Sequence, residues 1–257
     1  TGRAKIIVID RCYHGSVDET FATLDGAGNT VKREGNLGAP VDLAVTTRVV
    51  EFNDLVGMEA ALAQGDVAAI LMEPAMTNVG IVLPEDGYLM AVQELAKKYG
   101  ALLIIDETHT ISVGPGGMTL DLGLKPDFLT IGKAIAGGIP VGTFGMTEDV
   151  ANSIKKLVEL EIIDTGGIGS TLAGNAMSLA AMRATLTKVL TPAAFEKMVA
   201  LGTKWSDGVD ASIKEFEFFN FSRKASKSGF NSIFPDCKTS VPPKSSSTKP
   251  EKSLALK

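Results

Sequence analysis

Hydrophobic residues gather in short runs along the chain, and these runs alternate with longer segments that mix apolar and polar positions. Several of the runs are continuously apolar, which is typical of strands that are buried on both faces of a sheet. We therefore predict strands at residues 5–9, 68–72, 102–106, 128–131 and 141–146.

The longer segments have the amphipathic pattern of helices, and local signals mark several of their ends. Asp54 can cap a first helix, Gly65 and Gly100 can end the first two, and Pro192 follows Thr191 at a typical first helical position. The predicted helices span residues 54–64, 87–99, 147–158, 175–189 and 192–216. Strands that alternate with helices predict an α/β fold, with a mostly parallel sheet and helices on both faces.

The composition changes near residue 221, where serine, lysine and proline become dominant. Such a segment cannot bury enough apolar surface to offset the entropy of ordering it. We therefore predict a large domain at residues 1–220 and a disordered basic tail at residues 221–257. Residues 222–257 carry eight basic and two acidic side chains, which gives a net charge of +6. The rest of the chain carries 17 basic and 28 acidic side chains, which gives a net charge of -11.

The overall composition excludes several classes of function. The net negative charge of residues 1–221 argues against nucleic-acid binding. A weaker alternative is that the basic tail binds an anionic partner, such as nucleic acid or a membrane surface. No apolar run approaches the roughly 20 residues that span a bilayer, so we expect no membrane partner. Cys12 and Cys237 form no disulfide framework, which favours a reducing compartment, the cytoplasm. The two histidines and two cysteines lack the spacing of a metal site, and we expect none.

Charged residues follow two of the predicted strands directly. One strand ends at Asp106 and continues into Glu107, and another runs through Gly132 into Lys133. Open α/β sheets bind ligands at the carboxyl ends of their strands. A lysine there can form a Schiff base with an aldehyde, and a carboxylate can keep a ring nitrogen protonated, which is the chemistry of pyridoxal phosphate. Taken alone, Lys133 could be a solvated lysine and Asp106 could cap a turn.

Further motifs accompany this pair, and together they carry a family resemblance. They are Tyr13-His14-Gly15, Glu73-Pro74 with Asn78 and Gly80, Asp106-Glu107, Gly132-Lys133 with Gly137-Gly138, and Gly169-Ser170-Thr171-Leu172-Ala173-Gly174-Asn175. In order and spacing the chain resembles a class III (ω-type) pyridoxal-phosphate-dependent aminotransferase, most closely the glutamate-1-semialdehyde aminomutase branch. The resemblance implies the large domain of fold type I. The family's Ser-Gly-Ser/Thr phosphate loop and small C-terminal domain have no counterpart here, so we expect a chain truncated at both ends.

The resemblance also implies roles for individual residues around the cofactor. Lys133 forms the Schiff base and then moves the α-proton, while Asp106 pairs with the pyridine nitrogen. Four more side chains surround the ring: Tyr13 stacked on one face, His14 in the adjacent turn, Thr108 below the ring, and Asn78 near the phenolic oxygen. An isolated tyrosine such as Tyr13 would more often pack in a core.

The glycine-rich segment before residue 175 is a candidate phosphate contact. Ser170 and Thr171 offer hydroxyl groups, and the resemblance implies that Thr171 reaches the cofactor phosphate of a neighbouring subunit, in a homodimer with shared sites. The alternative is a flexible loop that ends in a helix cap. Glu73 is a candidate substrate contact. His109 is more often a structural histidine than an acid or base, and it is kept as the weaker candidate for such a role. No arginine stands in a recognisable motif for a substrate carboxylate.

The activity that the resemblance implies is transfer or intramolecular migration of an amino group, with a small-molecule amino donor and acceptor as partners. The sequence leaves open which of the two reactions occurs and which compounds take part. The alternative is a catalytically incomplete aminotransferase-like fragment that acts at most as a cofactor-binding or interaction module.

Overall fold

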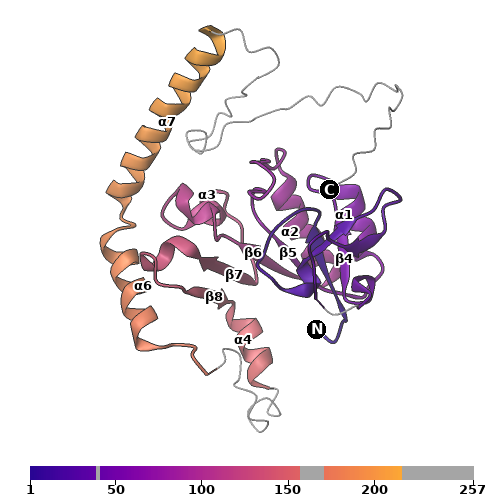
Figure 1. Cartoon of the computed structure of the whole chain (residues 1–257). Helices are drawn as coiled ribbons and strands as arrows, with labels where there is room; N and C mark the ends of the chain where they lie inside the picture. Colours follow the sequence, from indigo (N-terminus) through magenta and orange to yellow (C-terminus); the bar gives the residue numbers. More distant parts are fainter. Residues whose placement is uncertain (39–40, 157–170, 216–257) are drawn as a thin grey trace, which may run out of the picture.

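The centre of the molecule is a six-stranded sheet, seen in a computed structural model that describes residues 1–38, 41–156 and 171–215 (Figure 1). The strand order is β4-β1-β5-β6-β7-β8, with parallel neighbours from β4 to β7 and an antiparallel pair of β7 and β8. The mostly parallel sheet is therefore as predicted. The strands are β1 (Lys5–Ile9), β4 (Thr47–Val50), β5 (Val67–Met72), β6 (Leu102–Asp106), β7 (Phe128–Gly132) and β8 (Gly142–Met146).

The helices begin and end close to the residues expected from sequence. Asp54 accepts a hydrogen bond from the Gly57 amide at the start of α1, and Gly100 ends α2 in the left-handed conformation. Figure 1 shows α7 extending away from the sheet. The helices are α1 (Leu55–Leu62), α2 (Tyr88–Tyr99), α3 (Gly117–Asp121), α4 (Glu148–Lys155), α6 (Ala176–Lys188) and α7 (Pro192–Glu215).

The hydrophobic core lies where β1 and β5 meet α1 and α2. Ile7 of β1, Ile70 of β5, Met58 of α1 and Val92 of α2 are fully buried. Each such side chain contributes about 1.5–3 kcal/mol relative to an exposed position. This packing holds the ends of the central strands in fixed positions, and the loops that follow those strands form the site described below.

Four short elements depart from the prediction. The strands β2 (Ala22–Leu24) and β3 (Thr30–Lys32) and the helix α3 are too short for a periodic pattern to be recognised. Strand β4 contains Arg48, whose guanidinium donates to the Ala61 carbonyl oxygen and the Asp66 carboxylate, each at 2.8 Å. A charged residue whose head group lies at a sheet edge interrupts the apolar run that would mark a buried strand.

Part of the predicted organisation falls outside the described residues. The disordered tail at 221–257 and the end of the helix predicted at 147–158 lie there, so they and the domain division stay predictions. Within the residues that are described, the search for a membrane-crossing helix finds none of sufficient length and apolar character.

The buried carboxylate of Glu107 anchors the loop that follows β6. Glu107 is 0% exposed and accepts hydrogen bonds from the backbone amides of Met118, at 3.2 Å, and Thr119. The hydroxyl groups of Thr110 and Thr119 donate to it as well. A buried charge is tolerated when donors satisfy its oxygens, and here it ties the loop to the end of the sheet.

We expect Gly117→Ala to destabilise the protein by roughly 2 kcal/mol or more. Gly117 has φ +66°, and an added Cβ would lie 2.4 Å from Oε2 of Glu107. The matched control is Gly114→Ala in the same loop, where φ is -179° and no atom lies within 4 Å of the added Cβ. Urea unfolding of both variants measures the difference, and equal losses of stability would contradict the role of Glu107.

Candidate active site

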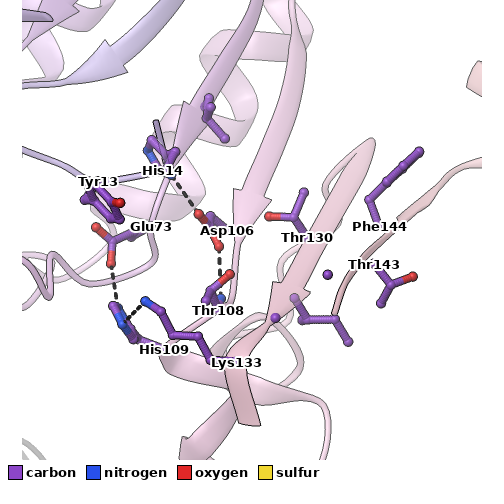
Figure 2. Close-up of a pocket in the computed structure, with 15 residues that line it drawn as sticks. Tyr13, His14, Glu73, Asp106, Thr108, His109, Thr130, Lys133, Thr143 and Phe144 are labelled. Atoms are coloured by element: carbon purple, nitrogen blue, oxygen red, sulfur yellow. Dashed lines mark hydrogen bonds and ion pairs between the residues drawn. The ribbon is translucent and has the colours of Figure 1, made fainter. Parts of the chain in front are cut away.

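A pocket of about 540 Å³ opens at the carboxyl ends of β5, β6 and β7 (Figure 2). Its walls come from the loop after β1, the ends of β5 and β6, the segment from β7 to the start of η4 (Lys133–Ala136), and the start of β8. A volume of this size suits a small-molecule ligand. Asp106 and Lys133, which the sequence analysis expected at one sheet edge, both line it.

The parallel register of β6 and β7 brings the acid and the lysine to this edge. Asp106, the last residue of β6, pairs with Thr130 of β7, and Lys133 comes directly after β7. Lys133 has φ +50°, a left-handed backbone conformation that costs a residue with a side chain about 1–3 kcal/mol. Such strain persists where the surroundings impose it, and here it accompanies a side chain that lies in the pocket.

His14 holds the Asp106 carboxylate in place by a direct contact between their side chains. Its Nδ1 lies 2.8 Å from Oδ2 of Asp106, and the Thr108 amide donates to Oδ1 at 3.0 Å (Figure 2). Burial alone would lower the pKa of His14 and raise the pKa of Asp106. The hydrogen bond to Asp106 and the interactions with Cys12 together outweigh burial and raise the pKa of His14 to about 10. Together with the Thr108 bonds it lowers the pKa of Asp106 to about 2. At neutral pH the pair is therefore an imidazolium and a carboxylate.

Among the residues that the resemblance placed around the cofactor, Tyr13, His14, Thr108 and Lys133 line the pocket with Asp106. Tyr13 is 36% exposed and packs edge-on against Phe21, with ring centroids 6.1 Å apart. Thus its ring is supported from behind while part of it stays accessible to a ligand.

The other predicted positions lie differently. Glu73 lines the pocket, but its side chain is only 4% exposed and accepts from Thr77. Asn78 is exposed and is not one of the residues that line the pocket. Thr171 is exposed in the turn before α6, and Ser170 lies outside the described residues. The roles given to Asn78, Ser170 and Thr171 stay predictions.

Two further residues line the pocket, one a weaker candidate from sequence and one not recognised there. His109, for which a structural role was favoured, lines the pocket, and its Nε2 contacts Nζ of Lys133 (Figure 2). Phe144, at the start of β8, adds an exposed aromatic ring. The position of His109, three residues after the acid that ends β6, is a sequence signal for a site residue. Phe144 gives no such signal, because only the antiparallel pairing of β7 and β8 brings it to the pocket.

The His14–Asp106 pair predicts a pH dependence of stability. The pKa of His14 lies above its usual 6.5, so its contribution is complete below pH 6.5 and is lost as the pH rises to about 10. The pKa of Asp106 lies below its usual 3.8, so its contribution is complete above pH 3.8 and is lost as the pH falls to about 2. We expect the difference in Tm between the wild type and His14→Phe to be largest near pH 6 and to shrink toward pH 10. Thermal unfolding at several pH values measures it, and a constant difference from pH 6 to 10 would contradict the assigned ion pair.

Comparison with known proteins identifies the family. The sequence profile of the class-III aminotransferases matches residues 1–221. Glutamate-1-semialdehyde 2,1-aminomutase of Anaeromyxobacter sp. (strain Fw109-5) is 37% identical over 214 residues, which cover 81% of this chain and 48% of that protein. The chain thus spans about half the length of the curated relatives it matches.

Solved structures agree with this assignment. A glutamate-1-semialdehyde aminomutase from Pseudomonas aeruginosa PAO1 superposes with a TM-score of 0.82 at 43% identity, over 90% of this chain and 55% of that one. A lysine-to-alanine variant of an enzyme with the same name and source was solved in complex with PMP. An omega-transaminase from Sphaerobacter thermophilus gives a TM-score of 0.70 at 30% identity, over 89% of this chain and 52% of that one. The α/β fold and the pyridoxal-phosphate family predicted from sequence are confirmed, and the chain belongs to the class III aminotransferases.

Proposed function

We propose that the protein represented by this chain uses pyridoxal phosphate to transfer an amino group or to move it within one substrate. The observation that carries the proposal is the placement of the Lys133 amine and the ionised Asp106 carboxylate in one pocket. An amine that can hold an aldehyde and a carboxylate that can hold a ring nitrogen are the two groups that this cofactor requires of a protein. The residues present therefore fit the cofactor.

Each residue has a distinct task in this proposal. Pyridoxal phosphate, when bound, supplies an aldehyde and an aromatic ring that withdraws electrons from the carbon that loses its proton. Lys133 holds the aldehyde and moves the proton between substrate atoms. Asp106 holds a proton on the ring nitrogen, and His14 keeps Asp106 ionised for that task. Tyr13 offers a partly exposed ring face at the pocket wall.

The comparisons favour migration as the reaction to assay first. The curated relative described above and the Pseudomonas aeruginosa structure with a TM-score of 0.82 are named aminomutases, so glutamate-1-semialdehyde is the first substrate to test. Transfer between separate amino donors and acceptors is the second, because the same lysine and carboxylate serve both reactions.

We also infer that the protein forms a homodimer with shared sites. Thr171, the predicted phosphate contact, is exposed and lies beside Leu172, which is 76% exposed. Met177 and Leu179 of α6 are exposed as well. Apolar side chains grouped around a predicted ligand contact are consistent with a surface that a second subunit covers.

A second candidate function is a cofactor-binding module without turnover. The observation that favours it is that no arginine is among the described residues that line the pocket, whereas a substrate carboxylate is commonly held by one. This candidate shares the site of Lys133 and Asp106 and differs only in the absence of product.

Covalent loading tests the proposal. The chain is incubated with pyridoxal phosphate, its visible absorbance is recorded, and borohydride is added to fix the cofactor on the lysine that holds it. We expect an absorbance band above about 400 nm, because a cofactor conjugated to an amine absorbs visible light. We also expect a modified peptide that contains Lys133. Modification spread over surface lysines would contradict the assigned site.

The matched variants are Lys133→Ala and Lys97→Ala. Lys97 is an exposed lysine in the last turn of α2 and does not line the pocket. We expect Lys133→Ala to abolish the band and Lys97→Ala to leave it unchanged. Turnover of glutamate-1-semialdehyde by the loaded wild type would then separate the enzyme from the binding module.

A further inference from the structure

The ring of Tyr13 at the pocket wall has few contacts that fix its orientation (Figure 2). In the part of the chain that the structure describes, its side chain makes no hydrogen bond, and its one ring partner is Phe21. The two ring centroids are 6.1 Å apart and the ring planes meet at 73°, an edge-on contact. The orientation of the Tyr13 ring therefore depends on whatever fixes Phe21.

Phe21 is held by Arg33, at the opposite end of the hairpin of β2 and β3. The Arg33 guanidinium lies over the Phe21 ring, 5.5 Å from its centroid, which is within the range of a cation–π contact. The backbone amide of Arg33 donates to the carbonyl oxygen of Phe21 at 3.0 Å, so the antiparallel pairing of the hairpin continues to these two residues. Phe21 thus contacts Arg33 as well as Tyr13.

The same guanidinium also holds the backbone of the pocket wall. Nη1 of Arg33 donates at 2.8 Å to the carbonyl oxygen of Cys12, the residue directly before Tyr13. Cys12 is 2% exposed, and a buried carbonyl group that loses its donor is costly. A single side chain therefore fixes Tyr13 in two ways, through its ring partner and through its backbone.

These two contacts explain why a guanidinium stands at this position. Arg33 is half-buried, and no carboxylate lies within ion-pair distance of it among the described residues, so it is not part of a surface salt bridge. The planar guanidinium can cover a ring with its face while an N–H in its plane reaches a carbonyl oxygen, which an ammonium group cannot do. The neighbouring Lys32 is exposed and donates to the Gly38 carbonyl oxygen instead, at 3.3 Å.

We propose that Arg33 is a positioning residue that keeps the ring of Tyr13 in place at the wall of the pocket. It acts on the ring through Phe21 and on the backbone through the Cys12 carbonyl group. The hairpin of β2 and β3 is then part of the site, although it does not line the pocket. The inference rests on the proposed function in that the ring held there serves the bound cofactor.

The test follows the Tyr13 ring directly, without cofactor or substrate. The full chain is produced with fluorotyrosine in place of its three tyrosines, and fluorine NMR records a signal for each of them. Tyr13→Phe identifies the Tyr13 signal, and Phe21→Leu gives the signal of a Tyr13 ring that has lost its partner. We expect Arg33→Met to move the Tyr13 signal toward its position in Phe21→Leu. Lys32→Met, which removes the same charge one residue away, should leave it unchanged.

A titration with pyridoxal phosphate then connects the ring to the ligand. We expect Arg33→Met to weaken binding about fivefold, since part of the free energy of a hydrogen bond from a charged donor is spent on holding the ring ready. Lys32→Met should bind like the wild type. An unmoved Tyr13 signal in Arg33→Met would overturn the proposal, and so would equal movement in Lys32→Met or an unchanged affinity beside a moved signal.

Melting curves show whether each variant folds. If Arg33→Met does not fold, Arg33→Lys decides, because it keeps the charge but loses the planar face. Its Tyr13 signal should move in the same direction to a smaller extent, and a signal at the wild-type position would count against the proposal. If the wild type takes up no pyridoxal phosphate on Lys133 while the Tyr13 signal moves as expected, the proposed function fails and the hold of Arg33 on Tyr13 stands.

Discussion

The parallel pairing of the central strands is the constraint on which the site depends. In a parallel sheet all carboxyl ends face one edge, so residues that follow β1, β5, β6 and β7 must meet there, although more than one hundred positions separate Tyr13 from Lys133. The buried packing of β1 and β5 against α1 and α2 fixes this edge. The side chains that the loops present at this edge then determine the chemistry of the pocket.

Two adjacent acidic residues at the end of β6 have different surroundings and different structural roles. Asp106 faces the pocket and is kept ionised by His14, whereas Glu107 turns inward and collects the donors of the following loop. Alternation along a strand sends neighbouring side chains to opposite sides. One carboxylate therefore lines the pocket while the next holds the loop that carries His109, so the site and its support arise from consecutive residues.

The extent to which sequence predicted this arrangement differs between elements. The buried strands and capped helices follow from local patterns. The meeting of Asp106 with Lys133 could also be predicted, because the carboxyl ends of parallel strands lie at one edge of the sheet. The pairing of His14 with Asp106 and the contact of His109 with Lys133 join residues that no sequence pattern links, because such contacts depend on loop conformation. The strands β2 and β3 were missed because they are short, and β4 because Arg48 interrupts its apolar run.

The left-handed backbone of Lys133 has a consequence for how the protein can change. At φ +50° a glycine would relieve the strain at that residue, so the position that carries the reactive amine is one where stability and activity favour different residues. Selection for thermal robustness alone would remove the lysine. A chain optimised only for stability would therefore carry glycine at this position and lose the amine that lies in the pocket.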